Sequence, residues 1–418
     1  MRTAVGALAA GSALMLLLCA GWVDGLSLVV LSLAVPAPYL SGGTRVAPAA
    51  AATAATLVAW VIRRALDARE RRDAPVPRRS IAGLFAALLL ATAFALQTGP
   101  ALRELVDWFL LLALLVVATH AFSEEPARVR RMALLIAGVM GAAGVFAALQ
   151  TAGILPASFH WGPSVNRATL GFGWPNELGM FMALGVPFAV HACVVTRGRG
   201  WKILARAGLA TTLAGLAATF SRGSWTAVAA ALLVLLLLGE WKFVMRGALL
   251  ALVAIVAIDA ASGGEITRRI TSTEGDWVVG QRLALTLAGL LMFRAHPLVG
   301  VGPGGFGVNL PDFGPQIPGL WNYTGSAQNL YVHMAAETGL VGLLALLALM
   351  GTGFVAALRA ARAPARSVEE ASLRRTVLWS FTVACFVGFF EWPFAHGVGE
   401  MIVLVAAMAF ALRAEGAR

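Results

Sequence analysis

Residues 132–152 read MALLIAGVMGAAGVFAALQTA, a run without a single charged side chain. As an α-helix, at about 1.5 Å per residue, this run is long enough to cross the roughly 30 Å hydrocarbon core of a bilayer. In hydrocarbon, a helix satisfies all of its backbone hydrogen-bonding groups within one segment, which an irregular chain cannot do. The stretch therefore predicts a helix that spans a membrane.

Comparable apolar runs follow one another along the whole chain. The 418 residues are 59% hydrophobic and 13% charged, which is too apolar for a soluble domain of this length. The runs lie near 4–22, 26–40, 47–63, 81–97, 102–121, 132–152, 178–195, 203–220, 225–239, 247–262, 329–357, 376–391 and 397–412. We predict an all-α polytopic membrane protein with about 12 transmembrane helices (roughly 11 to 13) and with residues 1–418 as a single integral membrane domain.

The distribution of basic residues indicates how the chain is oriented. The formal net charge is +11, and most of the 32 Lys and Arg residues fall in short segments between apolar runs. Such an excess marks loops on the cytoplasmic side. These segments are 63–79, 128–131, 197–206, 242–246 and 359–375, together with the two termini. We interpret the positive charge as a topology signal, and we expect no nucleic acid as a partner.

Two polar segments stand out by their length on the opposite side. Residues 153–177 form the shorter predicted periplasmic loop, and residues 263–328 form the longer one. The apolar periodicity of residues 281–293 predicts an amphipathic helix that lies against the membrane. Loops of this length usually have a function.

A glycine-rich turn lies in the longer loop. Gly300, Gly302 and Gly305 match the dinucleotide fingerprint G-x-G-x-x-G, which has meaning only between a strand and a helix of a βαβ unit. Here the motif lies in a loop of a helical protein. We therefore predict a tight turn rather than a nucleotide site.

Two arginines on the loop side could bind an anion. Arg222 lies between two apolar runs in Ser221-Arg222-Gly223-Ser224, and Arg282 lies on the predicted amphipathic helix. Guanidinium groups are permanently charged and match phosphate oxygens with a fork of donors. The alternatives are a snorkelling arginine at position 222 and a solvated charge at position 282. As a pair, the two arginines are suited to a diphosphate.

Several motifs resemble one known family. The sequence resembles the O-antigen ligase and polymerase family of bacterial inner-membrane glycosyltransferases, well over residues 165–345 and elsewhere only by topology. The motifs, in the family's order, are Gly171-Phe172-Gly173-Trp174-Pro175-Asn176-Glu177, Ser221-Arg222-Gly223, Gln281-Arg282, His296-Pro297-Leu298-Val299-Gly300-Val301-Gly302-Pro303-Gly304, Asn329-Leu330-Tyr331 and Glu337-Thr338-Gly339-Leu340-Val341-Gly342.

The resemblance implies a fold like the C-type glycosyltransferases and an activity without metal or other cofactor. A glycan would pass from an undecaprenyl-diphosphate carrier to an acceptor hydroxyl at the periplasmic side of the inner membrane, among membrane lipids. The first expectation is O-antigen ligation to lipid A-core or to another glycan or protein acceptor; the alternative is a polymerase of O-antigen or exopolysaccharide. Arg222 and Arg282 match the arginines that hold the donor diphosphate. Residues expected to contact substrate are Arg167, Asn176, His296, Asn329 and Tyr331.

One position departs from the family pattern. The family carries a histidine before Asn-Leu-Tyr, which resembles the group that takes the acceptor's proton, and here the residue is Gln328. A glutamine amide can orient an acceptor but cannot act as a base near neutral pH. His333, Glu391 and His396 are the candidates to replace it. His333 and Glu337 share a helix face, which by itself does not predict a metal site.

A transporter of anions or small solutes is the rival from another class. In it, the same arginines would bind an anion in transit. Few ionisable residues fall in the middle of the predicted spans, whereas transport pathways usually need them there. The sequence therefore favours the glycosyltransferase.

Overall fold

The structure of the protein is a computed structural model. It describes residues 22–32, 48–66, 74–155, 160–161, 165–170, 172–239, 276–320, 325–394 and 397–415, with a few isolated positions between 241 and 267. The predicted span at 4–22, most of the span at 247–262, and His396 lie outside the described residues.

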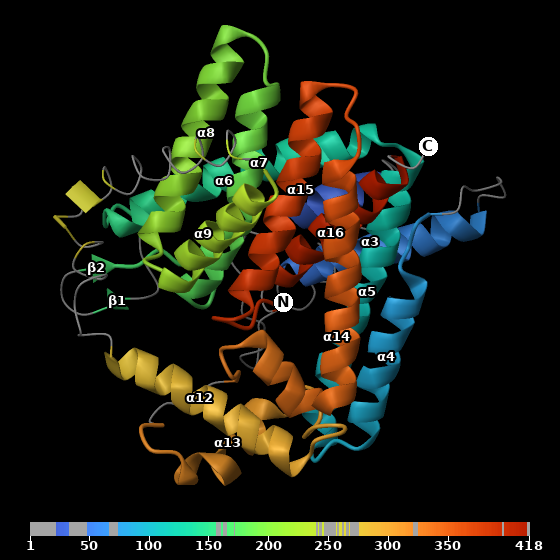
Figure 1. Ribbon diagram of the computed structural model, residues 1–418, viewed down its shortest axis with the longest axis vertical. Coiled ribbons are helices and arrows are strands. Elements are labelled where there is room, and N and C mark those ends of the chain that lie inside the picture. Colours follow the sequence, from blue (N-terminus) through green and yellow to red (C-terminus); the bar gives the residue numbers. More distant parts are fainter. Residues whose placement is uncertain are drawn as a thin grey trace, which may run out of the picture.

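Helices make up nearly all of the described secondary structure (Figure 1). They are α2 (Trp22–Ser32), α3 (Pro48–Leu66), α4 (Arg78–Ala93), α5 (Thr98–Glu124), α6 (Ala127–Thr151), α7 (Pro175–Val195), α8 (Arg199–Ala218), α9 (Arg222–Leu237), α12 (Asp276–Ala295), α13 (Phe306–Phe313), α14 (Leu330–Arg362), α15 (Val368–Val387) and α16 (Val398–Glu415). A 3-10 turn, η2 (Gly314–Gln316), follows α13, and β1 (His160–Trp161) pairs antiparallel with β2 (Val165–Asn166).

The helices follow the predicted apolar runs wherever the structure describes them. Four of them, α5, α6, α7 and α14, are long and apolar enough to cross a membrane, and two shorter apolar helices cover Ala49–Ile62 and Arg222–Leu237. The all-helical architecture fits the predicted membrane protein. The count of about 12 transmembrane helices and the periplasmic position of the long loop stay predictions.

Small residues let the central helices approach closely. A Cβ on Gly144 of α6 would lie 2.0 Å from the carbonyl oxygen of Thr211 in α8, so the two backbones touch at this point. The Thr211 hydroxyl donates to the carbonyl of Gly141 on the same face. Without a hydrophobic driving force in lipid, such close packing and interhelical hydrogen bonding hold helices together.

Helix α14 is interrupted where the glycine-rich turn meets it. Gly339 has φ 63° and ψ −164°, so the helical hydrogen-bond ladder stops there. The turn at residues 296–305 supplies the missing partners, because irregular backbone must be satisfied by other protein groups. The bonds are Val301 N to Ala336 O (2.9 Å), Gly302 N to Glu337 O (2.9 Å), Leu340 N to Pro297 O (2.8 Å) and Val341 N to Leu298 O (3.4 Å).

The predicted amphipathic helix at residues 281–293 is part of α12. Figure 1 shows α12 and α13 lying across one end of the bundle, against the start of α14. Ala284, Leu285, Ala288 and Met292 of α12 are buried with Phe306 and Leu310 of α13. The two helices therefore form a small layer of their own at this end.

The basic turns meet at the other end. The guanidinium of Arg130, after the α5–α6 turn, pairs with Glu369 at the start of α15 (3.5 Å). His191, near the end of α7, is 2.9 Å from the hydroxyl of Ser372 in α15. Asn176 begins α7, about 15 residues and hence roughly 20 Å of helix earlier. The bundle thus has a basic end and, opposite to it, an end covered by α12 and α13.

Candidate functional site

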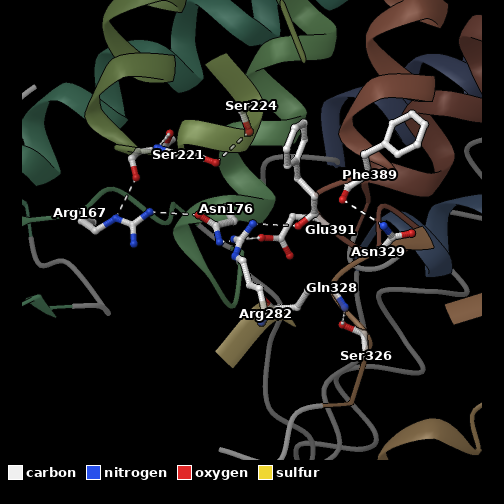
Figure 2. A network of polar contacts seen from close by, with 12 residues as sticks. Arg167, Asn176, Ser221, Ser224, Arg282, Ser326, Gln328, Asn329, Phe389 and Glu391 are labelled. Atoms are coloured by element: carbon white, nitrogen blue, oxygen red, sulfur yellow. Dashed lines mark hydrogen bonds and ion pairs between the residues drawn. The ribbon is translucent and has the colours of Figure 1, made fainter. Parts of the chain in front are cut away.

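A chain of polar contacts joins segments from across the sequence at the end covered by α12 (Figure 2). Arg167 is 6% exposed, and its Nε donates to the carbonyl of Thr219 at the end of α8 (2.9 Å). Its NH2 group donates to Oδ1 of Asn176 at the start of α7 (3.1 Å). The side-chain amide of Asn176 donates in turn to Oε1 of Glu391 (2.7 Å). Arg167 and Asn176, both expected to contact substrate, are thus brought together.

Arg282 completes this chain from α12. Its NH2 group lies 2.6 Å from Oε1 of Glu391, and its NH1 group donates to the carbonyl of Phe390 (3.1 Å). The side chains of Arg282 and Glu391 are 27% and 14% exposed, respectively. A guanidinium carries five N–H donors, so Arg282 keeps donors for a ligand while the α15–α16 connection holds its orientation.

Arg222 lies beside the same connection. It is the first residue of α9, and its side chain is exposed. The next residue, Gly223, packs so closely on Phe390 that an added Cβ would be 2.8 Å from the Phe390 Cβ. Phe390 therefore touches the Arg222 segment on one side and accepts a hydrogen bond from Arg282 on the other. Both arginines predicted to bind diphosphate border one short segment.

Two residues with strained backbone precede the helices that border the site. Phe220 has φ 49° and Gln328 has φ 50°, in the left-handed region. That conformation costs a residue with a side chain roughly 1–2 kcal/mol, and such strain gathers at functional sites. Ser221 follows Phe220 as the N-cap of α9, and Asn329 follows Gln328 as the N-cap of α14.

Asn329 and Tyr331 both hold the start of α14 in place. The Asn329 Oδ1 accepts from the amides of Tyr331 (3.0 Å) and Val332 (3.1 Å), which is a regular N-cap. Its Nδ2 donates to the carbonyl of Phe389 (3.3 Å), and the Tyr331 hydroxyl donates to the carbonyl of Cys385 (2.7 Å). Residues 329–330 therefore lie beside residues 388–389. Contact of these two residues with substrate stays a prediction.

His333 is packed between two aromatic rings, and both of its ring nitrogens have a partner. The side chain is 3% exposed and lies between the rings of Phe306 (5.3 Å) and Trp392 (4.1 Å). Its Nδ1 accepts from the amide of Ala327 (3.3 Å), which places the proton on Nε2, 3.4 Å from Glu337. His333 therefore supports the Ala327–Gln328 segment rather than facing the network.

Glu337 clamps the glycine-rich turn. Its two oxygens accept from the amides of Gly304 and Phe306, each at 2.9 Å. Gly300 and Gly302 of the G-x-G-x-x-G match have positive φ, as does Gly304 between them and Gly305, whereas Gly305 itself has φ −86°. The tight-turn interpretation is therefore confirmed at Gly300 and Gly302. In the part of the chain that the structure describes, His, Cys, Asp and Glu side chains form no group of three or more that could hold a metal ion.

His296 lies at the beginning of this turn. Its carbonyl accepts from the amide of Gly300 (2.9 Å), and its ring is partly exposed. Among the described residues, no contact joins the His296 ring to the Arg167–Asn176–Glu391–Arg282 network. Its predicted role in substrate binding stays a prediction.

The electrostatics of the site centre on Glu391. This residue lies in the connection between α15 and α16, outside the helices. Burial raises the pKa of the Glu391 carboxyl, the guanidinium of Arg282 and the hydrogen bond from Asn176 oppose the rise, and the nearby charge of Glu177 adds to it. The ordinary pKa of this group is 4.5, so the Glu391 carboxyl is a stronger base than an exposed glutamate.

The fold and the site together define a class: a helical membrane protein that gathers arginines at one end, around a connection between two helices. Residues 207–347 match the sequence model of the O-Antigen ligase family. The resemblance to this family that the motifs predict is thereby confirmed. The matched segment runs from α8 to α14 and includes both arginines of the predicted diphosphate site. A search of curated proteins finds no match.

The network extends beyond the matched segment. Arg167 and Asn176 precede it, and Phe390 and Glu391 follow it. In the sequence, Glu391 was one of three candidates to replace the missing histidine, and nothing local distinguished it. Its pairing with Arg282 joins residues 109 positions apart, so only the packed helices reveal it.

Proposed function

We propose that the protein transfers a glycan from an undecaprenyl-diphosphate donor to an acceptor hydroxyl, and that the reaction takes place at the periplasmic side of the inner membrane. O-antigen ligation to lipid A-core is the first assignment. Extension of a lipid-linked O-antigen or exopolysaccharide by a polymerase is the second. The family match supports glycosyl transfer of either type.

The observation that supports the proposal is that Gly223, the neighbour of Arg222, packs on Phe390, whose carbonyl accepts a hydrogen bond from Arg282. The diphosphate is the leaving group of the reaction, and its charge grows as the bond to the sugar breaks. Fixed guanidinium groups stabilise such charge most where the protein has already oriented them. Arg282 is oriented by Glu391 and Phe390, and Arg222 stands at the N-terminus of α9, whose dipole also favours an anion.

The proposed orientation of the protein in the membrane rests on the difference between the two ends of the bundle. Basic loops face the cytoplasm in most membrane proteins, and the turns with Arg130 and Glu369 lie together at one end. The site lies at the other end, with α7 running between them. This arrangement supports a periplasmic site, where the lipid-linked donor would reach α12 from the membrane surface.

We propose that the two arginines do without a divalent cation, because they supply the positive charge that a metal would otherwise bring to the diphosphate. The test is transfer by purified protein in the presence and absence of EDTA. An equal rate supports the proposal, and loss of transfer that Mg²⁺ or Mn²⁺ restores would refute it.

The deciding experiment reconstitutes the purified protein with a defined undecaprenyl-diphosphate glycan and a lipid A-core acceptor. A ligase yields one product in which a long glycan has moved to the acceptor in a single step. A polymerase yields a ladder of lengths still on the carrier. If the donor is unchanged and the liposomes instead take up phosphate in a manner that depends on Arg222 and Arg282, the protein is a transporter and the proposal fails.

A further inference from the structure

The missing histidine raises the question of which group removes the acceptor's proton. A proton acceptor must lie beside the diphosphate arginines, reach the solvent side of the site and have an oxygen or nitrogen that is not already committed. Among the described acidic and histidine side chains, Glu391 belongs to the network, Glu177 follows Asn176 on α7, and His333 and Glu337 lie on α14 after Gln328. Within the described part of the chain, the ring of His296 has no contact with the network.

Three of these groups are committed to the fold. His333 uses both ring nitrogens, between the Ala327 amide and Glu337. Glu337 accepts from two amides of the glycine-rich turn. Glu177 caps the start of its own helix α7, because its Oε2 accepts from the amides of Gly173 and Trp174.

Glu391 differs from them because it pairs with Arg282, one of the two arginines predicted to bind the diphosphate. Oε1 accepts from both Asn176 and Arg282, whereas Oε2 has no hydrogen-bond partner in the part of the chain that the structure describes. Oε2 is not one of the fully buried polar atoms without a partner, and the Glu391 side chain as a whole is 14% exposed. One oxygen therefore anchors the carboxylate and the other is available (Figure 2).

Glu391 follows the segment that borders the start of α14. Gly388 and Phe389 lie beside Leu330 and Asn329, through the bonds Leu330 N to Gly388 O (2.6 Å) and Asn329 Nδ2 to Phe389 O (3.3 Å). Gln328 occupies the family's histidine position. The side chains of Phe389 and Trp174 are 52% and 54% exposed nearby, and exposed aromatic rings offer flat apolar faces to sugars.

We infer that Glu391 is the catalytic base of the chain, taking the proton of the acceptor hydroxyl on Oε2 while Oε1 stays bound to Asn176 and Arg282. The inference rests on the proposed function. The acceptor oxygen forms a bond to the anomeric carbon as that carbon's bond to the diphosphate oxygen breaks. The electron pair leaves on the undecaprenyl diphosphate, held by Arg222 and Arg282, and the protonated Glu391 then releases its proton to water.

The pairing with Arg282 gives the base a link to the donor. One guanidinium contacts the carboxylate through NH2 and keeps other donors for the diphosphate. A bound diphosphate would draw the Arg282 charge away from Glu391, which makes the carboxylate more basic when the donor is in place. The charged groups that face Glu391 from neighbouring elements are Arg282 of α12 and Glu177 of α7.

The test compares Glu391→Gln with the wild-type protein in the reconstituted system. A glutamine oxygen can still accept from Asn176 and Arg282, but it cannot take a proton. We expect transfer to fall by about 100-fold or more, the usual contribution of a general base, with donor binding unchanged. Glu369→Gln is the matched control, because this glutamate pairs with Arg130 at the basic end of the bundle, and it should transfer as the wild type does.

The pH profile separates a base from a structural residue. A base works only when ionised, so the wild-type kcat/KM should fall as the pH decreases through the pKa of Glu391, which burial places above 4.5. The Glu391→Gln protein should show no such acid limb.

A second experiment uses azide as the acceptor. Glu391→Ala should form a glycosyl azide when azide is added, since azide needs no proton acceptor.

The outcomes distinguish this inference from the proposed function. If Glu391→Gln transfers at the wild-type rate, or loses donor binding together with turnover, Glu391 is not the base. Either result leaves the diphosphate site intact as a proposal. If instead the wild-type protein transfers nothing and Arg282→Ala binds the donor as the wild type does, the proposed function itself fails.

Discussion

At the residue scale, the site depends on how each guanidinium is held. Arg282 is fixed by a carboxylate and a carbonyl, whereas Arg222 projects from the first turn of α9 with an exposed side chain. Donors that are already oriented lose little free energy to reorganisation when a charged ligand binds, because their positions need not change. We therefore expect Arg282 to set the position of the diphosphate and Arg222 to close on it.

Replacing either arginine tests the diphosphate site. Arg222→Ala and Arg282→Ala should each lower transfer by roughly 100-fold or more, as the loss of one preorganised donor typically does. Arg222→Lys and Arg282→Lys should recover only part of it, because an ammonium lacks the fork of donors. Transfer and donor binding are measured on the purified protein. Arg294→Ala, in the exposed last turn of α12, is the control, and full turnover by Arg222→Ala would contradict the clamp.

Introducing the family's histidine tests the inference on the base from another direction. If Glu391 takes the proton, Gln328→His should leave the transfer rate within about threefold of the wild type, because the step already has its acceptor. Histidine tolerates the left-handed backbone of position 328 better than most residues do. The rate is measured in the same reconstituted system. A gain of about tenfold or more would show that the chain lacks a base.

At the element scale, α14 and the glycine-rich turn form one unit. The break at Gly339 exposes backbone groups that would otherwise bond within the helix, and the turn at 296–305 pairs with them in both directions. Glu337 then fastens the turn through two more amides. Because His333 precedes Glu337 by one helical turn and holds the Ala327 amide, the same unit also sets the position of Gln328.

Gly339→Ala should destabilise this unit. The alanine would need a positive φ with an extended ψ, a backbone region that essentially only glycine adopts and that costs other residues about 1–3 kcal/mol. Its Cβ would also lie 2.2 Å from the carbonyl carbon of Leu298. We expect a lower thermal unfolding temperature in detergent. Gly351→Ala in the same helix meets nothing within 4 Å, so it should be neutral or slightly stabilising. Equal unfolding temperatures for the two variants would contradict the role of the break.

At the scale of the whole molecule, the two ends of the bundle differ in charge and in the helices that cover them. Arg128, Arg130 and Arg131 lie near Arg374 and Glu369 at the basic end. The other end carries the α12–α13 layer and the arginine site. Positive loops remain on the side of synthesis, so the site should face away from the cytoplasm.

Cysteine labelling tests this orientation. Leu298→Cys lies in the glycine-rich turn, where the leucine is 65% exposed, and Ala365→Cys lies in the exposed α14–α15 turn. In spheroplasts, a membrane-impermeant maleimide should label position 298 at once and position 365 only after lysis. Of the three native cysteines, Cys193 and Cys385 are partly exposed and Cys19 lies outside the described residues, so the unaltered protein gives the background labelling. Labelling in the reverse order would place the site in the cytoplasm and refute the proposed location.

The sequence alone determined the helical membrane class, the position of most described helices, the two candidate arginines and the family resemblance. These features are local: apolar runs, basic loops and short motifs can each be recognised without knowing what lies opposite in space. Even the turn at Gly300 and Gly302 was predictable, because glycine is the residue that takes a positive φ without strain.

Only the tertiary structure decided which polar groups meet. Asn176 and Glu391 are 215 positions apart, and Arg282 and Glu391 are 109 apart, so no pattern within one helix could pair them. The packing of α7, α12 and the α15–α16 connection sets those distances. For the same reason the sequence left His333 and Glu391 as equal candidates. In the structure, His333 is packed between Phe306 and Trp392, whereas Glu391 pairs with Arg282 through Oε1.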